Sequence, residues 1–372
     1  MRAEIRASTP SRLCLFGEHL DYLGLEVIAV AINLRFSARI AKRDDSLIRI
    51  AIRDSSIDTL NAENKEGLYT IYEFDISKPI TYQNNRDYLK STVNVLLREG
   101  YALSGFDIQM DSEIPIRKGM CSSSAMVVVL TRAILEAIGH GDAENPEKIA
   151  HLAFRAEVTE FGEPGGMMDH YASALGGLVN LSFPDGNTEV YPLFAKLGGR
   201  FILFDSLQQK DTTRVLGNAK KPALEAIAAL SEYGITSVTD FADDTKMHLL
   251  EKLDEAHRRV LSADIDNYRI LLEAKKLLAA EEIDDARIGA LISRHHANLR
   301  DGLQISTDRI EKILDTALEN GALGGKINGS GGGGCGYVYA FEKDCENIMK
   351  AIEALGYPTK MLMQDTGVRK EN

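Results

Sequence analysis

The hydrophobic pattern changes character half-way along the chain, and this change restricts the folds that are open to it. Before residue 184, short apolar or alternating runs typical of strands are interleaved with helical stretches. From residue 220 to 320 long charged helical stretches replace them, and strand patterns then return. The expected strands cover residues 27–32, 47–52, 106–110, 177–183, 337–341 and 361–364, and the clearest helices cover 88–98, 123–138, 146–160 and 343–355. This mixture of helices and strands predicts the α+β class.

A turn-forming segment separates the two patterns. Residues 184–187 read Pro-Asp-Gly-Asn, which are residue types that favour tight turns. We therefore place a boundary within residues 184–195 and divide the chain into an N-terminal domain, 1–190, and a C-terminal domain, 191–372.

Composition excludes several classes of protein. The 43 Lys and Arg residues are outnumbered by 55 Asp and Glu residues, and the net charge of −12 argues against a nucleic-acid or anionic-membrane partner. No apolar stretch approaches the roughly 20 residues of a membrane helix, and the first residues lack the apolar core of a signal peptide. The cysteines at positions 14, 121, 335 and 345 form no CxxC pair, which argues against a disulfide scaffold or a zinc site. We therefore expect a soluble, cytoplasmic protein.

A glycine turn and three serines lead into an apolar helix at residues 119–125. The free N–H groups and positive dipole end of a helix N-terminus suit a phosphate chain, and Arg117 and Lys118 add positive charge. Serine hydroxyls can also bind Mg²⁺. From the residues alone, an ordinary Ser N-cap explains the segment equally well.

Two familiar nucleotide-binding motifs are missing or out of place in the sequence. GxxxxGK[ST] does not occur, which excludes a P-loop NTPase. The glycine run 329–334 satisfies GxGxxG formally, but it follows a helical pattern and precedes a strand, which argues against a dinucleotide site. So many glycines together indicate that the backbone approaches another group closely, with a flexible loop as the alternative.

An acidic helix end runs into a Pro-Gly-Gly turn and then a further acid. Glu157, Glu160 and Glu163 precede the turn, and Asp169 follows it. Such acids can converge on one cleft, where one holds a metal and another accepts a proton from a hydroxyl group. A solvated acidic helix followed by a loop accounts for the pattern equally well. For His170 we favour a buried, hydrogen-bonded role.

In chain order, these segments resemble the motifs of the GHMP small-molecule kinases, a family that includes galactokinase, homoserine kinase, mevalonate kinase and phosphomevalonate kinase. Residues 17–22 read Gly-Glu-His-Leu-Asp-Tyr, which is similar to the galactokinase signature Gly-Glu-His-Thr-Asp-Tyr. Residues 164–169 resemble the galactokinase segment Pro-Cys-Gly-Ile-Met-Asp, and residues 326–335 resemble its C-terminal glycine loop. The resemblance implies a two-domain fold, with a ribosomal-S5-domain-2-like N-terminal half, a ferredoxin-like, helix-rich C-terminal half, and substrate and ATP in the cleft between them.

The resemblance also implies roles for individual residues. Asp169 takes the place of the carboxylate that accepts the proton of the sugar hydroxyl, and Arg12 that of the cation that orients it. Ser123 and Glu157 take the Mg²⁺ positions, with Ser122, Ser124 and Glu160 as alternatives. The sugar-binding positions fall on Glu18, His19, Asp21 and Tyr22, and the nucleotide-binding positions fall on Lys118, Gly119, Cys121, Ser122, Ser123, Ser124, Gly329 and Gly331. ATP and Mg²⁺ are therefore the implied cofactors, and a monosaccharide is the implied partner.

The implied activity is phosphorylation of the anomeric hydroxyl of a galactose-like sugar, with galactose as the leading candidate. Ser11 and Gly165 depart from the galactokinase pattern, as does the phosphate loop, so a uronic acid, arabinose, fucose or a heptose are alternative acceptors. A non-catalytic sugar and nucleotide sensor is a further alternative. Such a sensor is expected to have lost Asp169 or Arg12, and both are present.

Two cations lie in the segment 204–214, which resembles the strand and loop that follow in these kinases. Lys210 and Arg214 could meet a uronic-acid carboxylate. We favour the simpler interpretation that both are solvated loop cations.

Overall fold

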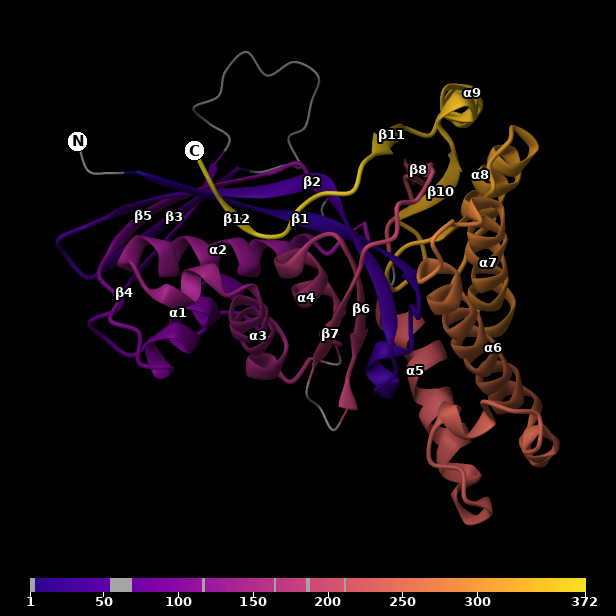
Figure 1. Ribbon diagram of the computed structural model, residues 1–372. Helices are drawn as coiled ribbons and strands as arrows, with labels where there is room; N and C mark the ends of the chain where they lie inside the picture. Colours follow the sequence, from indigo (N-terminus) through magenta and orange to yellow (C-terminus); the bar gives the residue numbers. More distant parts are fainter. Residues whose placement is uncertain (1–3, 54–68, 116–117, 164, 185–187, 211) are drawn as a thin grey trace.

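The computed structural model describes residues 4–53, 69–115, 118–163, 165–184, 188–210 and 212–372, which form two β-sheets with helices packed on them (Figure 1). The strands of the larger sheet are β1 (Ile5–Phe16), β2 (Val27–Lys42), β3 (Leu47–Arg53), β4 (Tyr69–Asp75), β5 (Phe106–Ser112), β6 (Leu178–Ser182), β7 (Glu189–Leu193) and β12 (Arg369–Glu371). Their order is β12-β1-β2-β5-β3-β4, and β2 also pairs with β6, which pairs with β7. Within this sheet only β3 and β5 run parallel, among the residues that the structure describes.

Helices from the same half of the chain cover one face of the larger sheet (Figure 1). They are α1 (Tyr88–Arg98), α2 (Ser122–Ile138), α3 (Pro146–Glu157) and α4 (Met168–Leu175). Helix α2 is apolar nearly all round and is buried between β1 and β2 on one side and the other helices on the other. Its position fixes where its first turn, and therefore the serine segment, can lie.

The smaller sheet carries the helices of the second half. Its strands are β8 (Gly199–Asp205), β9 (Gly324–Ile327), β10 (Cys335–Phe341) and β11 (Thr359–Leu362), in the antiparallel order β11-β8-β10-β9. The helices are α5 (Thr212–Ala229), α6 (Glu255–Leu278), α7 (Asp285–Ala297), α8 (Asp308–Glu319) and α9 (Glu342–Ala354). The long helices expected between residues 220 and 320 are therefore confirmed. Among the described residues, no helix combines the length and hydrophobicity needed to cross a bilayer; a cytoplasmic location stays a prediction.

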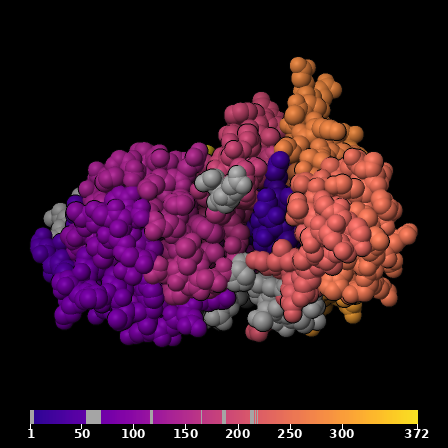
Figure 2. All heavy atoms as spheres, turned by 90° about the horizontal axis from the view of Figure 1, so that it is seen from below, coloured from indigo at the N-terminus to yellow at the C-terminus, as the bar shows by residue number. Residues whose placement is uncertain are grey.

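The two halves share one hydrophobic core. Phe16 of β1, Leu271 of α6 and Tyr337 of β10 are all fully buried and belong to the same cluster. In the space-filling view the first half of the chain and the helix-rich second half stand side by side, with an indigo N-terminal segment visible between them (Figure 2). The shared core holds the halves in a fixed relation, so a site between them is built by both.

The end of the described chain returns to the larger sheet. Strand β12 pairs antiparallel with β1, and isolated bridges join Gln364 to Ile32 and Thr366 to Gly176. Arg35 of β2 fixes this segment through Asp365, at 2.7 Å, and the carbonyl of Gly367, at 2.8 Å. The sequence gives no local signal for this return. The division at residues 190 and 191 stays a proposal, and residues 369–371 pair with the first half rather than the second.

Other elements differ from the sequence expectation for identifiable reasons. Strand β2 continues to Lys42 instead of ending at residue 32, because buried and more exposed residues alternate over residues 34–40. The residue pattern did not predict helix α4 or strands β1, β4, β7, β9 and β12, and the strand at β8 was implied only by the resemblance over residues 204–214. Helix α3 ends at Glu157, and a 3-10 turn, Thr159–Phe161, replaces its expected last turn and stops at Gly162 in a left-handed conformation.

Candidate active site

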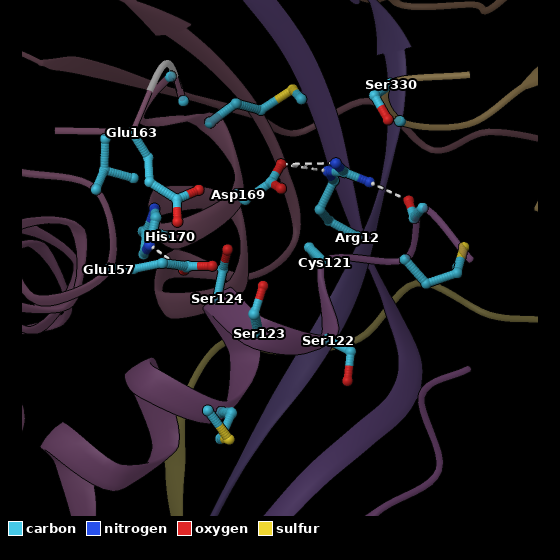
Figure 3. A pocket seen from close by; sticks show the side chains of 18 of the residues that line it. Arg12, Cys121, Ser122, Ser123, Ser124, Glu157, Glu163, Asp169, His170 and Ser330 are labelled. Carbon is cyan, nitrogen blue, oxygen red and sulfur yellow. Dashed lines mark hydrogen bonds and ion pairs between the residues drawn. The ribbon is translucent and has the colours of Figure 1, made fainter. Parts of the chain in front are cut away.

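A cavity of about 1080 Å³ lies at the junction of the two halves. Its lining comes from β1 and the turn after it, the loop before α2, the ends of α3 and α4, the loop after β8 and the glycine run after β9. Most residues predicted for the site from the sequence line this one cavity. Figure 3 shows Arg12 and Asp169 facing each other beside the first turn of α2.

The centre of the cavity holds a cation and a carboxylate. Arg12, which β1 positions, is 3% exposed, and Asp169, in the first turn of α4, is 30% exposed. Arg12 Nε and Nη2 lie 2.8 and 2.6 Å from Asp169 Oδ1. Arg12 Nη1 also donates to the carbonyl oxygen of Gly119, at 3.2 Å. Burial alone would lower the pKa of Arg12, but the charge of Asp169 raises it, so Arg12 stays charged and fixes the carboxylate relative to the phosphate loop.

The serine segment forms the first turn of α2 as the sequence predicts. Gly119 and Cys121 adopt left-handed conformations, with φ of 88° and 45°, and this turn aims the helix N-terminus at the cavity. Ser122, Ser123 and Ser124 then occupy the first helical positions, where backbone N–H groups have no partner within the helix. Arg117 lies outside the described residues. The arrangement suits the oxygens of a phosphate chain.

Cys121 has a supporting position in this turn. Its Sγ lies 3.7 Å from Ser11 Oγ and 3.8 Å from Ser173 Oγ, and burial raises its thiol pKa. The thiol is therefore neutral and packs the loop against β1 and α4. Lys118 lines the cavity and pairs with Asp205 of β8 at 3.2 Å.

The glycine run 329–334 is a buried junction rather than a flexible loop. A Cβ atom at Gly119 would lie 2.4 Å from the carbonyl oxygen of Asn328, and one at Gly334 would lie 2.5 Å from that of Lys118. The backbone of Gly119 thus contacts that of Asn328, and the backbone of Gly334 contacts that of Lys118. A side chain at either glycine would prevent this contact. Gly329 also lines the cavity, whereas Gly331 packs against Ile305 outside the lining, so the structure does not bring Gly331 to the cavity.

Glu18 is committed to protein partners. Its Oε1 accepts a hydrogen bond from Gly329 N at 2.7 Å, and its Oε2 pairs with Lys326 Nζ. Both side chains of this ion pair are buried, and Lys326 also donates to the carbonyl oxygen of Cys14 at 3.0 Å. Glu18 therefore joins the N-terminal signature to the glycine run. Sequence reasoning missed Lys326 and took the residues before the glycine run as helical, whereas residues 324–327 form β9.

His19 and Asp21 face the cavity more directly. His19 Nδ1 lies 3.1 Å from Tyr22 Oη, and its buried Nε2 has no hydrogen-bond partner among the described residues. Burial lowers the pKa of His19 to about 4, so its ring is neutral at pH 7. Burial and the nearby charge of Asp169 raise the pKa of Asp21 to about 6.

Gly166 makes room for this arrangement. A Cβ atom there would fall 1.9 Å from Asp21 Oδ2, so the backbone of the turn before α4 closes directly over the carboxylate. The turn that contacts Asp21 through Gly166 thus leads directly into the helix that carries Asp169. Tyr22 itself lines the cavity, and Lys220 lies 5.2 Å from the centre of its ring.

Glu157 and Ser123 face each other across the start of α2 (Figure 3). Glu157 Oε2 lies 2.7 Å from Nε2 of the buried His170, which has the hydrogen-bonded role favoured from the sequence. Burial opposes ionisation of Glu157, but hydrogen bonds from His170, Ser123 and Ser124 lower its pKa. A charged carboxylate and a hydroxyl beside a phosphate site are hard oxygen donors that fit Mg²⁺.

The alternative Mg²⁺ positions, Ser122, Ser124 and Glu160, are not equally placed for binding a metal. Glu160 turns away from the cavity and bonds to Tyr82 and Arg98. Among the described residues, no cluster of three or more His, Cys, Asp or Glu side chains is arranged to hold a metal. A bound Mg²⁺ would therefore need oxygens from the phosphate chain as well.

Lys210 differs from the sequence interpretation. It is half-buried and lines the cavity, so it is not a solvated loop cation. The side chain of Arg214 lies outside the described part of the chain.

Comparison with known proteins is consistent with this geometry. The chain matches models of the GHMP kinases N terminal domain over residues 87–177 and the GHMP kinases C terminal region over residues 274–358. It also matches the galactokinase galactose-binding signature over residues 2–42.

Relatives and solved structures agree with these matches. A galactokinase of Streptomyces coelicolor is 28% identical over 354 residues, covering 93% of this chain and 87% of that protein. A mevalonate kinase of Thermococcus sibiricus is 27% identical over 370 residues, covering 99% and 98%. Lactococcus lactis galactokinase complexed with galactose has a similar fold, with a TM-score of 0.79 at 19% identity, covering 99% of this chain and 95% of that one. The chain therefore belongs to the GHMP kinase family, has its two-domain α+β fold, and carries the galactose-binding signature of its galactokinase branch.

Proposed function

We propose that this kinase transfers a phosphoryl group from ATP to the anomeric hydroxyl of a galactose-like monosaccharide, giving a sugar 1-phosphate and ADP. The observation that carries the proposal is that His19 and Asp21, within the galactose-binding signature, line the same cavity as the Arg12–Asp169 pair. The retained pair also argues against a non-catalytic sensor. The relatives named galactokinase add support along most of the chain.

In this mechanism, the acceptor hydroxyl oxygen forms a bond to the γ-phosphorus while the bond from that phosphorus to the bridging oxygen of ADP breaks. The hydroxyl proton passes to a carboxylate oxygen of Asp169, which also aligns the attacking oxygen. Arg12 holds that carboxylate through Oδ1 and ties it to the carbonyl oxygen of Gly119. The acceptor and the phosphate loop are thereby kept in register, which is the main demand of phosphoryl transfer.

The first turn of α2 binds the phosphate chain. The N–H groups of Ser122, Ser123 and Ser124 and the helix dipole stabilise the negative oxygens. Mg²⁺, when bound, supplies further charge neutralisation, and Ser123 and Glu157 are the residues that would hold it.

A kinase for an alcohol that carries a carboxylate is the second candidate. Lys210 supplies a half-buried cation on the cavity wall, which an anionic acceptor could use. Mevalonate kinases are also among the relatives that match nearly the full chain. The acceptors of this class are a uronic acid and mevalonate.

Steady-state kinetics with a panel of acceptors tests the proposal. ADP release is measured with ATP and Mg²⁺ for galactose, arabinose, fucose, a heptose, galacturonate and mevalonate. We expect the highest kcat/KM for galactose, and a product whose phosphorus NMR spectrum shows phosphate on the anomeric carbon. A higher kcat/KM for galacturonate or mevalonate would favour the second candidate, and no ADP release with any acceptor would favour a sensor.

A further inference from the structure

Among the residues that the structure describes, one cation on the cavity wall has no ion-pair partner. Three other cations on the wall have such partners: Arg12 pairs with Asp169 at 2.6 Å, Arg86 with Glu163 at 2.7 Å and Lys118 with Asp205 at 3.2 Å. Within the described ranges, no carboxylate lies within ion-pair distance of Lys210. A half-buried ammonium group without an ion-pair partner is suited to bind an anionic group of a ligand.

The segment that carries Lys210 is fixed by backbone hydrogen bonds. Ser206 N donates to the carbonyl oxygen of Gly334 at 3.0 Å, and Gly334 N donates to that of Gln208 at 2.9 Å. A Cβ atom at Gly333 would lie 2.8 Å from the carbonyl oxygen of Gln209. The loop after β8 is thus attached to the glycine run, which holds the backbone just before Lys210 in place.

The ammonium group lies over the start of the phosphate loop. Lys210 Nζ is 3.0 Å from the point that a Cβ atom on Gly119 would occupy. Burial lowers the pKa of Lys210 to about 8, and the charges of Glu18, Arg12 and Asp169 are close enough to influence it as well. An anion that lies between the first turn of α2 and Asp169 would therefore pass beside both Lys210 and Arg12, and it would relieve the repulsion between these two cations.

We propose that Lys210 Nζ binds a non-bridging oxygen of the γ-phosphoryl group and holds it while the group moves to the acceptor. The inference rests on the proposed ATP-dependent reaction, and it adds a phosphoryl-binding cation from the second half of the chain, whereas Arg12 comes from the first half. Proximity to Gly119 favours the phosphoryl group over a carboxylate of the acceptor, because Gly119 begins the loop that leads to the helix N-terminus. Charge-assisted hydrogen bonds of this kind are among the stronger ones in proteins.

Nucleotide binding to Lys210→Met tests the assignment separately from the acceptor. Calorimetry compares a nonhydrolysable ATP analogue with ADP, each with Mg²⁺. Loss of a hydrogen bond to a charged group should weaken the analogue by about tenfold or more and leave ADP within about twofold. The readout does not require turnover, so it remains valid even if the acceptor panel yields no activity and the proposed sugar kinase reaction fails.

Kinetics and matched variants complete the test. Lys210→Met should lower kcat by about 10²-fold, as expected for loss of one transition-state contact, and change the KM of the acceptor little. Lys210→Arg should recover part of the discrimination between the analogue and ADP. Lys221→Met removes the same charge from the 75% exposed Lys221 of α5 and should change none of these values.

Two results would overturn the assignment. One is an unchanged ratio of analogue to ADP affinity in a Lys210→Met protein whose melting temperature matches the original chain. The other is a loss confined to the KM of galacturonate or mevalonate, which would place Lys210 against the acceptor carboxylate instead.

Discussion

The two sides of the cavity are built in different ways. The phosphate wall, residues 118–124 and 329–334, takes its shape from backbone contacts between glycines and from the N-terminus of α2. The acceptor wall, which we define as Arg12, His19, Asp21 and Asp169, takes its shape from charged or polar side chains that are buried or partly buried. The backbone of the phosphate wall can suit any triphosphate. Selection of the acceptor depends instead on the four side chains of the acceptor wall. Changes in the first should alter stability and nucleotide affinity, and changes in the second should alter chemistry.

The acid of the acceptor wall should give the largest effect. Asp169→Asn keeps the size of the side chain but removes the proton acceptor, so kcat should fall by about 10²–10⁴-fold. Binding of ATP and sugar should stay nearly intact, which calorimetry measures alongside coupled ADP release. Unchanged turnover would mean that another group performs this role.

A substitution of Glu18 tests the ion pair that joins the N-terminal signature to the glycine run. Glu18→Gln leaves Lys326 buried without its counter-charge, which should lower the free energy of unfolding by about 3–5 kcal/mol. Urea denaturation measures the loss. Glu346→Gln, which alters the pair between the 80% exposed Glu346 and Lys350, should leave the urea midpoint unchanged. A stable Glu18→Gln protein with a large rise in sugar KM would instead make Glu18 a sugar ligand.

A pair of glycine substitutions isolates the backbone contact of the phosphate wall. Gly334 and Gly356 have similar φ angles, 79° and 88°, but only a Cβ at Gly334 meets another atom, the carbonyl oxygen of Lys118. Gly356→Ala should lose about 1–2 kcal/mol of stability from backbone strain alone. Gly334→Ala should lose more and should also weaken nucleotide binding. Equal losses of stability and unchanged nucleotide affinity would contradict this account.

The smallest effect is a pH dependence of the acceptor wall. Burial, together with the charge of Asp169, raises the pKa of Asp21 to about 6, so the carboxylate is ionised above that pH and protonated below it. In the proposed function the ionised form accepts hydrogen bonds from sugar hydroxyls, so kcat/KM for the acceptor should fall about tenfold per pH unit below about 6. Asp21→Asn should remove this limb from the profile. A flat profile down to pH 5 would show that the charge of Asp21 does not matter.

The local parts of the site were predictable from the sequence, and the long-range connections were not. The serines at the start of α2 and the acid after the Pro-Gly-Gly turn have short-range signals that propensity rules detect. The pairing of Glu18 with Lys326 spans 308 residues, and nothing in either neighbourhood indicates it. Lys210 looked like a loop cation because its burial depends on the glycine run, which is distant in sequence.

The fold shows the same difference between elements with local sequence signals and elements that depend on long-range contacts. The apolar α2 and the long helices of the second half were expected, since their patterns are long and periodic. Strand β1 was missed because residues 5–16 mix charged, polar and apolar side chains that are buried for different reasons: in the core, in the Arg12 ion pair and against the returning segment.

Strand β12 determines when the larger sheet can be completed as the protein folds during synthesis. Ser8 and Glu371 are hydrogen-bonded although 363 residues separate them, so the outer edge of β1 stays open until residues 369–371 have left the ribosome. An open edge recruits other strands, and closing so long a loop is slow. A nascent chain that stalls inside the helix-rich half would thus expose a pairing edge, and chaperone contact during translation should concentrate on that half-finished sheet.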